Sequence, residues 1–106
     1  MSKERLRLDG ILRRVLQETA GEVHLYYQPP AGLKTQYPCI CYKLNRIRGL
    51  YANGHIYNQH YSYTVTVIDK KPDSVIAEAV SRLDQCRHDR EYTADNLYHD
   101  VFTMNI

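Results

Sequence analysis

The segment "HYSYTVTVIDKKPDS", residues 60–74, alternates in polarity through its first eight residues. Its odd-numbered positions are apolar or aromatic, and its even-numbered positions are small or polar: Tyr61, Tyr63, Val65 and Val67 against His60, Ser62, Thr64 and Thr66. A period of two predicts a half-buried strand. The strand ends at Asp69, where two lysines, a proline and an Asp-Ser pair lead into a segment with a different period.

A second extended segment precedes this strand and carries a hairpin signal at its end. Asn53-Gly54 is the dipeptide most typical of a two-residue turn, because both central positions need positive φ. If these two residues form the turn, the register places Ile40 opposite Val67, Tyr42 opposite Val65 and Leu44 opposite Tyr63. The apolar faces of the two strands then coincide, which a one-residue slip would destroy. Farther out, the same register places Arg46 opposite Tyr61, Arg48 opposite Gln59 and Leu50 opposite Tyr57.

The predicted hairpin, residues 39–69, is longer than the globule it belongs to. Residues 39–52, at about 3.4 Å each, make an arm of roughly 45 Å, whereas a compact domain of this size has a radius of gyration of about 13 Å. The outer part mixes arginines with apolar and aromatic residues, which is typical of interface anchors. The predicted oligomer interface consists of Arg46, Arg48, Leu50, Tyr51, Ile56, Tyr57 and Tyr61. The alternative is a flexible, solvated loop, which Gly49 and Gly54 would loosen.

The other elements complete an α+β fold. An amphipathic helix is predicted from Lys3 to about Thr19, ending near Gly21, followed by a short strand at 22–27 and a Pro-rich loop at 28–38. A second helix is predicted in "KPDSVIAEAVSRL", with Pro72 in its first turn and Asp73 at the positive end of its dipole. Strands at 86–92 and 96–106 follow, separated by the turn "TADN". The order is α-β-β-β-α-β-β, with a mostly antiparallel sheet.

Whole-chain properties exclude several classes. The 106 residues predict one domain, 1–106, and 43% hydrophobic with 25% charged residues is ordinary for a soluble globular protein. No apolar run approaches the roughly 18 residues of a membrane span, and "MSKERLRLDG" lacks the apolar core of a signal peptide. Three cysteines, an odd number, favour reduced thiols in a cytosol. The net charge of +2 is too balanced to indicate a nucleic-acid binder on its own.

No motif predicts catalysis, a metal or a cofactor. Cys39-X-Cys41 has no second matched pair, as structural zinc sites usually have. His88-Asp89 and His99-Asp100 are adjacent residues in strands, so each pair points to opposite faces and cannot converge on one ion. There is also no Gly-rich phosphate loop and no nucleophile elbow. We therefore expect neither an enzyme nor a bound cofactor.

A nucleic-acid-binding module is one alternative. Basic residues interleaved with tyrosines could form a stacking surface for single strands, and the candidates are Lys43, Arg46 and Arg48 with Tyr42, Tyr51, Tyr57 and Tyr61. In the predicted register, however, Lys43 projects from the face opposite to Arg46 and Arg48. This arrangement weakens a single basic platform.

Three stretches carry a family resemblance: "YPCICYKLNRIRGLYANGHIY" (37–57), "YTVTVIDKKPDS" (63–74) and "YTADNLYHDVFTMNI" (92–106). Together they resemble the small tail-completion, or tail-terminator, proteins of long-tailed bacteriophages, also labelled minor capsid or head-tail joining proteins. The motifs are specific as an ordered set: the Tyr-Pro-Cys-Ile strand start, the strand-to-Pro-Asp-Ser junction and the Tyr-Thr-Ala-Asp-Asn-Leu turn. None of them marks an active site.

The resemblance implies a structural virion protein rather than an enzyme. It implies a homo-oligomeric ring, a hexamer, assembled in the host cytoplasm on the end of the completed tail tube. Such a ring ends tube growth and presents a surface to the head connector, and DNA passes through it without sequence-specific binding, past acidic or neutral groups. A stopper or adaptor of the head-tail neck is the alternative within the same class. A heterologous contact closes such a ring, and an overhanging hairpin is a suitable donor, since its edge can extend a neighbour's sheet.

Overall fold

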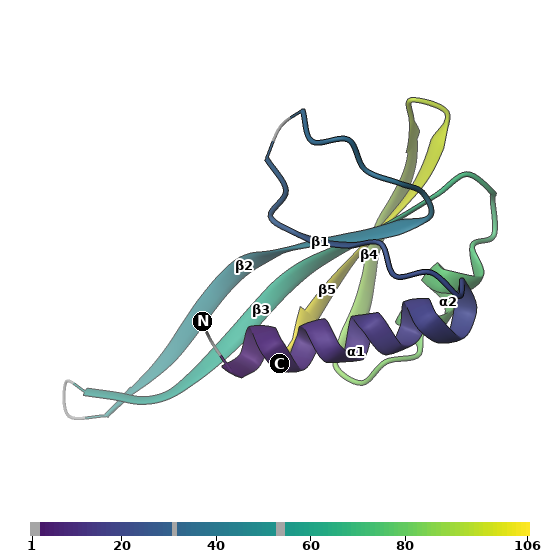
Figure 1. Ribbon diagram of the computed structural model, residues 1–106. Coiled ribbons are helices and arrows are strands. Elements are labelled where there is room, and N and C mark those ends of the chain that lie inside the picture. The colour runs from purple at the N-terminus through teal and green to yellow at the C-terminus, as the bar shows by residue number, and fades with distance from the viewer. Residues whose placement is uncertain (1–2, 31, 53–54) are drawn as a thin grey trace.

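The computed structural model describes residues 3–30, 32–52 and 55–106, and at residues 48, 50–52 and 55–59 it describes the backbone alone. The elements are α1 (Lys3–Thr19), β1 (Leu25–Tyr27), β2 (Cys39–Ala52), β3 (His55–Asp69), α2 (Val75–Ser81), β4 (Cys86–Ala94) and β5 (Leu97–Asn105). The predicted α+β class and element order are confirmed (Figure 1). Neither helix in the described part of the chain combines the length and apolar character needed to span a membrane.

The strands form one five-stranded sheet in the order β1-β2-β3-β5-β4. β2, β3, β5 and β4 pair antiparallel, whereas β1 pairs parallel with β2, Leu25 lying opposite Ile40. The strand predicted at 22–27 is thus shorter than expected. Its parallel pairing was not predicted, since it arises between segments separated by the whole 28–38 loop.

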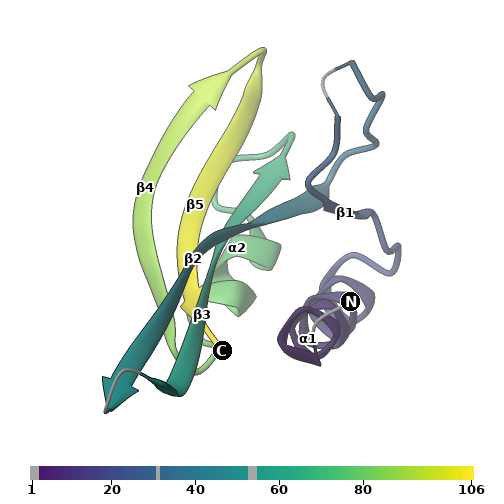
Figure 2. The ribbon, with the colours of Figure 1, turned by 90° about the vertical axis from the view of Figure 1, so that its left-hand side faces the viewer.

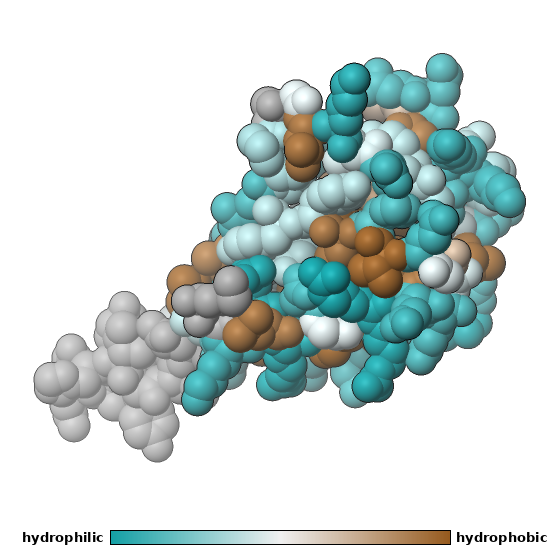
Figure 3. Space-filling model, in the orientation of Figure 1, coloured by the Kyte–Doolittle hydropathy of each residue, from teal (hydrophilic) through white to brown (hydrophobic). Residues whose placement is uncertain are grey.

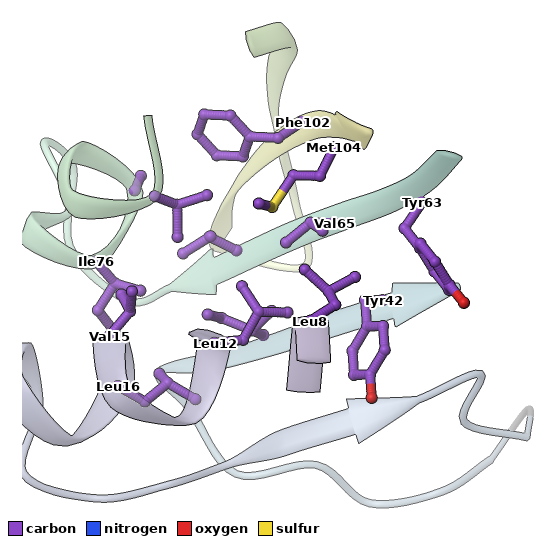
Figure 4. Close-up of a cluster of buried hydrophobic side chains, with 14 residues drawn as sticks. Leu8, Leu12, Val15, Leu16, Tyr42, Tyr63, Val65, Ile76, Phe102 and Met104 are labelled. Atoms are coloured by element: carbon purple, nitrogen blue, oxygen red, sulfur yellow. The ribbon is translucent and has the colours of Figure 1, made fainter. Parts of the chain in front are cut away.

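Both helices lie on the same face of the sheet (Figures 1 and 2). We call this the helix face and the opposite one the open face. Figure 4 shows the core between helices and strands, with α1 side chains pointing at the sheet. Its buried members are Leu8, Leu12, Val15, Leu16, Ile40, Tyr42, Tyr63, Val65, Val67, Ile76, Ala77, Val80, Phe102 and Met104. The apolar periodicity of α1 and of β3 therefore converges on one core.

The helix ends follow local chemistry, with one correction. α1 ends as predicted, because Gly21 has φ of +74° and its N–H donates to the Leu16 carbonyl at 3.1 Å. The start of α2 was predicted wrongly, since the helix begins at Val75 and both Pro72 and Asp73 precede it. Ser74 is its N-cap, accepting from the Ala77 N–H at 3.3 Å and donating to the buried Asp69 carboxylate at 2.7 Å. The end of β3 is thereby tied directly to the start of α2.

The two predicted turns have different outcomes. Asp95 and Asn96 both have positive φ, 52° and 61°, and form a two-residue hairpin turn between paired Ala94 and Leu97, so the turn predicted at "TADN" is shorter than expected and Thr93 and Ala94 belong to β4. The turn predicted at Asn53-Gly54 lies outside the described residues. Ala52 and His55, which flank it, are paired with each other.

The β2–β3 register agrees with the prediction in its inner half and again next to the turn, where Tyr51 pairs with Ile56 and Ala52 with His55 after a second register shift. Ile40 pairs with Val67, Tyr42 with Val65 and Leu44 with Tyr63, as expected. A bulge at Asn45 then shifts the register by one residue, so Arg46 pairs with Ser62, Arg48 with His60 and Leu50 with Asn58. The predicted pairs of Arg46 with Tyr61, Arg48 with Gln59 and Leu50 with Tyr57 are therefore wrong.

Candidate functional site

The outer half of the β2–β3 hairpin projects from the body of the molecule (Figure 1). We call residues 47–52 and 55–61 the arm. Among the strand pairs that the structure describes, these residues pair only with each other, because β5 stops opposite Ser62 and β1 pairs only with residues 40–42 of β2. The radius of gyration is 14.8 Å and the longest extent 51 Å, against about 13 Å expected for a compact chain of this length. The predicted overhang is therefore present.

The structure describes the side chains of two of the predicted interface residues, Arg46 and Tyr61. Arg46 is exposed at the base of the arm, and Tyr61 is half-buried against the core cluster. Tyr61 is also held through its backbone, because its carbonyl accepts from the Ile106 N–H at 2.9 Å. The side chains of the other five, Arg48, Leu50, Tyr51, Ile56 and Tyr57, lie outside the described part. Their role at an interface stays a prediction.

The bulge changes which side chains share a face at the base of the arm. Asn45 donates to the Ser62 hydroxyl at 3.5 Å, and Arg46 pairs with the same serine. Ser62 lies on the open face together with Thr64, the partner of Lys43. Arg46 and Lys43 therefore share the open face, and the prediction that they project from opposite faces is wrong.

The bulge also reveals a residue that sequence reasoning missed. Ile47 pairs with Tyr61 on the helix face and is 48% exposed. The signal was present in the chain, since the apolar positions run Ile40, Tyr42, Leu44 and then Ile47, a step of three instead of two. A single break in a period of two is what one bulged residue produces. Ile47 is thus an exposed apolar side chain at the root of the arm.

A polar network anchors the inner half of the hairpin to α1. The Tyr42 hydroxyl donates to the Asp9 carboxylate at 2.5 Å, and Arg13 bonds the same carboxylate from one helical turn away. Arg5 contacts the Tyr42 hydroxyl at 3.4 Å and lies over the Tyr27 ring at 4.5 Å. This network stands directly inside the point where the arm leaves the body.

The network shifts the protonation of both partners. Partial burial raises the pKa of Asp9, but hydrogen bonds from Tyr42 and Arg13 and the nearby Arg5 outweigh it, so the pKa lies below its ordinary value. Burial and the Asp9 carboxylate raise the pKa of Tyr42 to about 12. At neutral pH the pair is therefore a neutral phenol donating to a carboxylate.

The side chains on the open face of the sheet are mostly polar or basic. Three rows cross the sheet in register: Cys41, Thr66, Val101 and Arg90; Lys43, Thr64, Thr103 and Arg87; and Arg46, Ser62 and Asn105. Cations thus lie along β2 and β4, and the side chains between them are four hydroxyl groups together with Val101 and Asn105. The face is hollowed in two places of about 570 Å³ each, one lined by Lys43 and Thr66 among others, the other by Arg46 and Arg87.

The thiols and the His-Asp dipeptides do not gather into a site. Cys39, Cys41 and Cys86 are unbridged. The Cys41 thiol and burial raise the pKa of Cys39, which is fully buried. His88 bonds Asp100 across the strands at 3.1 Å, whereas Asp89 bonds Arg87 at 3.0 Å and also Thr103, so adjacent residues point to opposite faces as predicted. Within the described residues, no group of three or more His, Cys, Asp or Glu side chains is placed to hold a metal.

The described tyrosines among those proposed for single-strand stacking do not share a face with the basic residues. Tyr42 is 1% exposed and Tyr61 half-buried, both on the helix face, away from Lys43 and Arg46. The side chains of Tyr51 and Tyr57 lie outside the described part. Comparison of the chain with models of protein families, with curated proteins and with solved structures finds no match.

Proposed function

We propose that this chain is a structural virion protein that forms a ring on the end of a bacteriophage tail tube, ends tube growth and joins the tail to the head. The observation that carries the proposal is the arm, a paired ribbon that extends beyond its own core. The family resemblance of residues 37–57, 63–74 and 92–106 supports the same role. The partners are further copies of this chain, the tail tube protein and the head connector.

The physical reason for assembly is the arm's lack of support. A two-stranded ribbon is marginally stable alone in water, and additional strands or packing stabilise it. In the described strand pairs, residues 47–52 and 55–59 of the arm have no third strand beside them, so the backbone donors and acceptors of their outer edges can pair with another chain, whereas the Tyr61 carbonyl already accepts from Ile106. A neighbouring subunit that receives the arm satisfies these groups, and the contact is heterologous, so repetition closes a ring.

In the view of Figure 3 the surface is largely hydrophilic, and its apolar residues form separate patches. Ile47 stands at the root of the arm, and the predicted anchors Leu50, Tyr51, Ile56 and Tyr57 follow along it. A contact that buries the arm would therefore bury aromatic and aliphatic anchors of the kind that dominate interface energies.

The proposal is tested with Leu50→Ala combined with Tyr57→Ala. The matched control is Leu6→Ala with Tyr98→Ala, which removes the same two residue types from exposed positions on α1 and β5. Native mass on purified tail tubes measures ring formation, and electron microscopy of assembled tails measures their length. The first variant is expected to lose the ring and to give tails of uncontrolled length, and the control to keep both. Unaltered rings and lengths in the first variant would refute the interface.

A stopper or adaptor of the head-tail neck is the alternative for the same arm. The two roles differ in the surface on which the ring forms. A terminator binds tail tubes that have never met a head, whereas a stopper binds the connector of filled heads. Mixing the chain separately with tubes and with heads therefore assigns the role.

A further inference from the structure

The open face has a larger excess of positive over negative side chains than the whole chain has. The net charge is +2, yet the described cations of this face, Lys43, Arg46, Arg87 and Arg90, are accompanied by the single carboxylate of Asp89. Asp89 accepts hydrogen bonds from the Thr103 hydroxyl and from Arg87, the latter at 3.0 Å, and these contacts outweigh its slight burial and keep its pKa below the ordinary value. The carboxylate thus neutralises part of the Arg87 charge and leaves the other three cations unopposed on this face.

The cations stand along two borders with a hollow between them. β2 and β4 are separated by three strand spacings, so the borders lie about 14 Å apart. The floor between them carries Ser62, Thr64, Thr66 and Thr103, which are half-buried hydroxyls. We propose that this concave, cation-bordered open face binds the phosphate backbone of duplex DNA.

The floor favours DNA over an acidic protein as the occupant. Protein interfaces have an apolar core with a polar rim, but of the exposed large apolar residues on the described strands only Tyr92 lies on this face. Protein–DNA interfaces are polar and positively charged, and hydroxyl side chains commonly contact phosphates there. The open face matches that composition.

The aromatic residues favour a duplex over a single strand. Tyr92 stacks on His99 with ring centroids 4.6 Å apart and an interplanar angle of 9°, and Arg90 lies over the Tyr92 ring at 5.3 Å. The Tyr92 ring therefore already stacks within the chain, whereas single-strand binding relies on rings that accept unpaired bases. Contacts to a duplex backbone need cations and hydroxyls alone.

This inference deepens the proposed function by naming the face that meets the DNA. It differs from the acidic or neutral lining that the resemblance implies. Phosphate contacts are electrostatic and independent of sequence, so a duplex held by them still slides. The inference can fail separately from the proposed function. Duplex binding is measured on the chain alone, whereas ring formation and tail length are measured with tail tubes and assembled tails.

The test measures binding of a short labelled duplex at increasing salt. With four phosphate contacts the slope of log affinity against log salt is about −0.9 per contact, so a roughly fourfold rise in salt lowers the affinity about 100-fold. Two double variants each remove half of the contacts: Lys43→Gln with Arg46→Gln, and Arg87→Gln with Arg90→Gln. Each should halve the slope, so that the same rise in salt lowers the affinity only about 10-fold. Arg7→Gln with Arg14→Gln, exposed residues of α1, is the matched control and keeps the wild-type slope. Asp89→Asn raises the affinity, because it removes the one carboxylate.

Several results would overturn the inference. The first is that the wild-type chain does not bind the duplex at low salt. The second is that both border variants keep the wild-type slope. The third is that the α1 control loses as much of the slope as those variants do. Tighter binding of a single strand of equal length would contradict the choice of a duplex. Binding of poly-glutamate without binding of duplex would assign the face to an acidic protein instead.

Discussion

The inner and outer halves of the β2–β3 hairpin share one backbone pairing but differ in their surroundings. The inner half, residues 39–44 with 63–69, is flanked by β1 and β5 and covered by α1, and its helix-face side chains are buried. The arm, residues 47–52 with 55–61, has none of these strand neighbours in the described pairing. The inner half is therefore explained by the fold of the single chain. We propose that contact with a partner accounts for the outer half, because this half contributes little to the core of its own chain.

The boundary between the halves is built from few residues. Asn45 bulges where β2 leaves the core, and the Arg46–Ser62–Asn105 row is the last one shared with β5. Just inside it, Tyr42 is tied to Asp9 of α1. Bulges bend strands and increase twist. The bulge and this anchor thus set the direction of the arm within the single chain.

The largest expected effect lies in the core beneath the inner half. Leu12→Ala removes a fully buried α1 side chain that packs on this half and should lower the free energy of unfolding by about 3 kcal/mol. Chemical denaturation measures the loss. Leu6→Ala, at a residue that is 53% exposed, is the control and should change it by less than about 0.5 kcal/mol. Equal losses in the two variants would mean that α1 does not cover the hairpin as described.

The next effect concerns the network that anchors the inner half. Asp9→Asn should lower the free energy of unfolding at pH 7 by about 1–2 kcal/mol, because a charged hydrogen-bond acceptor for Tyr42 and Arg13 is lost. The folded pKa of Asp9 lies below the unfolded value near 3.8, so this stabilisation is complete above that value. It disappears as the pH falls through the folded pKa.

Denaturation at a series of pH values separates this carboxylate from the others. The gap in stability between wild type and Asp9→Asn should close on acidification. Glu18→Gln, at an exposed position of α1, provides the control and should show no such gap. A gap that persisted below the folded pKa would refute the assigned role of the Asp9 charge.

The smallest effect on stability is expected in the arm itself. Replacing residues 48–60 with a short turn should change the free energy of unfolding by less than about 1 kcal/mol, since an unsupported ribbon is marginal on its own. The matched control shortens the other hairpin by replacing residues 92–99, which removes pairs that β5 makes with β3 at Ile68 and Asp69. Calorimetry should find the control clearly less stable. A large loss on shortening the arm would show that the arm supports its own core.

The sequence predicted the elements whose signals are local. α1, the inner register and the turn at Asp95-Asn96 follow from periodicity and turn chemistry, and all agree with the structure. The parallel pairing of β1 was missed because its partner is distant in the chain. The α2 start was missed because the preference of Pro72 for a first helical turn was given more weight than the capping hydroxyl of Ser74.

The candidate site was predicted less completely than the fold. The overhang followed from strand length, but the placement of Arg46 did not, because one bulged residue exchanges the faces of the β2 residues that follow it, as far as the second register shift after Leu50. The unbroken alternation of β3 masked the step from Leu44 to Ile47 in β2. The open face with its two rows of cations was not predicted, since β2 and β4 are distant in the sequence and only the order of strands in the sheet brings them onto one face.

Native mass on tail tubes, compared between the full chain and the chain with residues 48–60 replaced, tests the central claim most directly. The account predicts that the full chain adds the mass of a closed ring to the tube end, whereas the shortened chain, although folded, adds none. A shortened chain that caps the tube as well as the full chain does would contradict it.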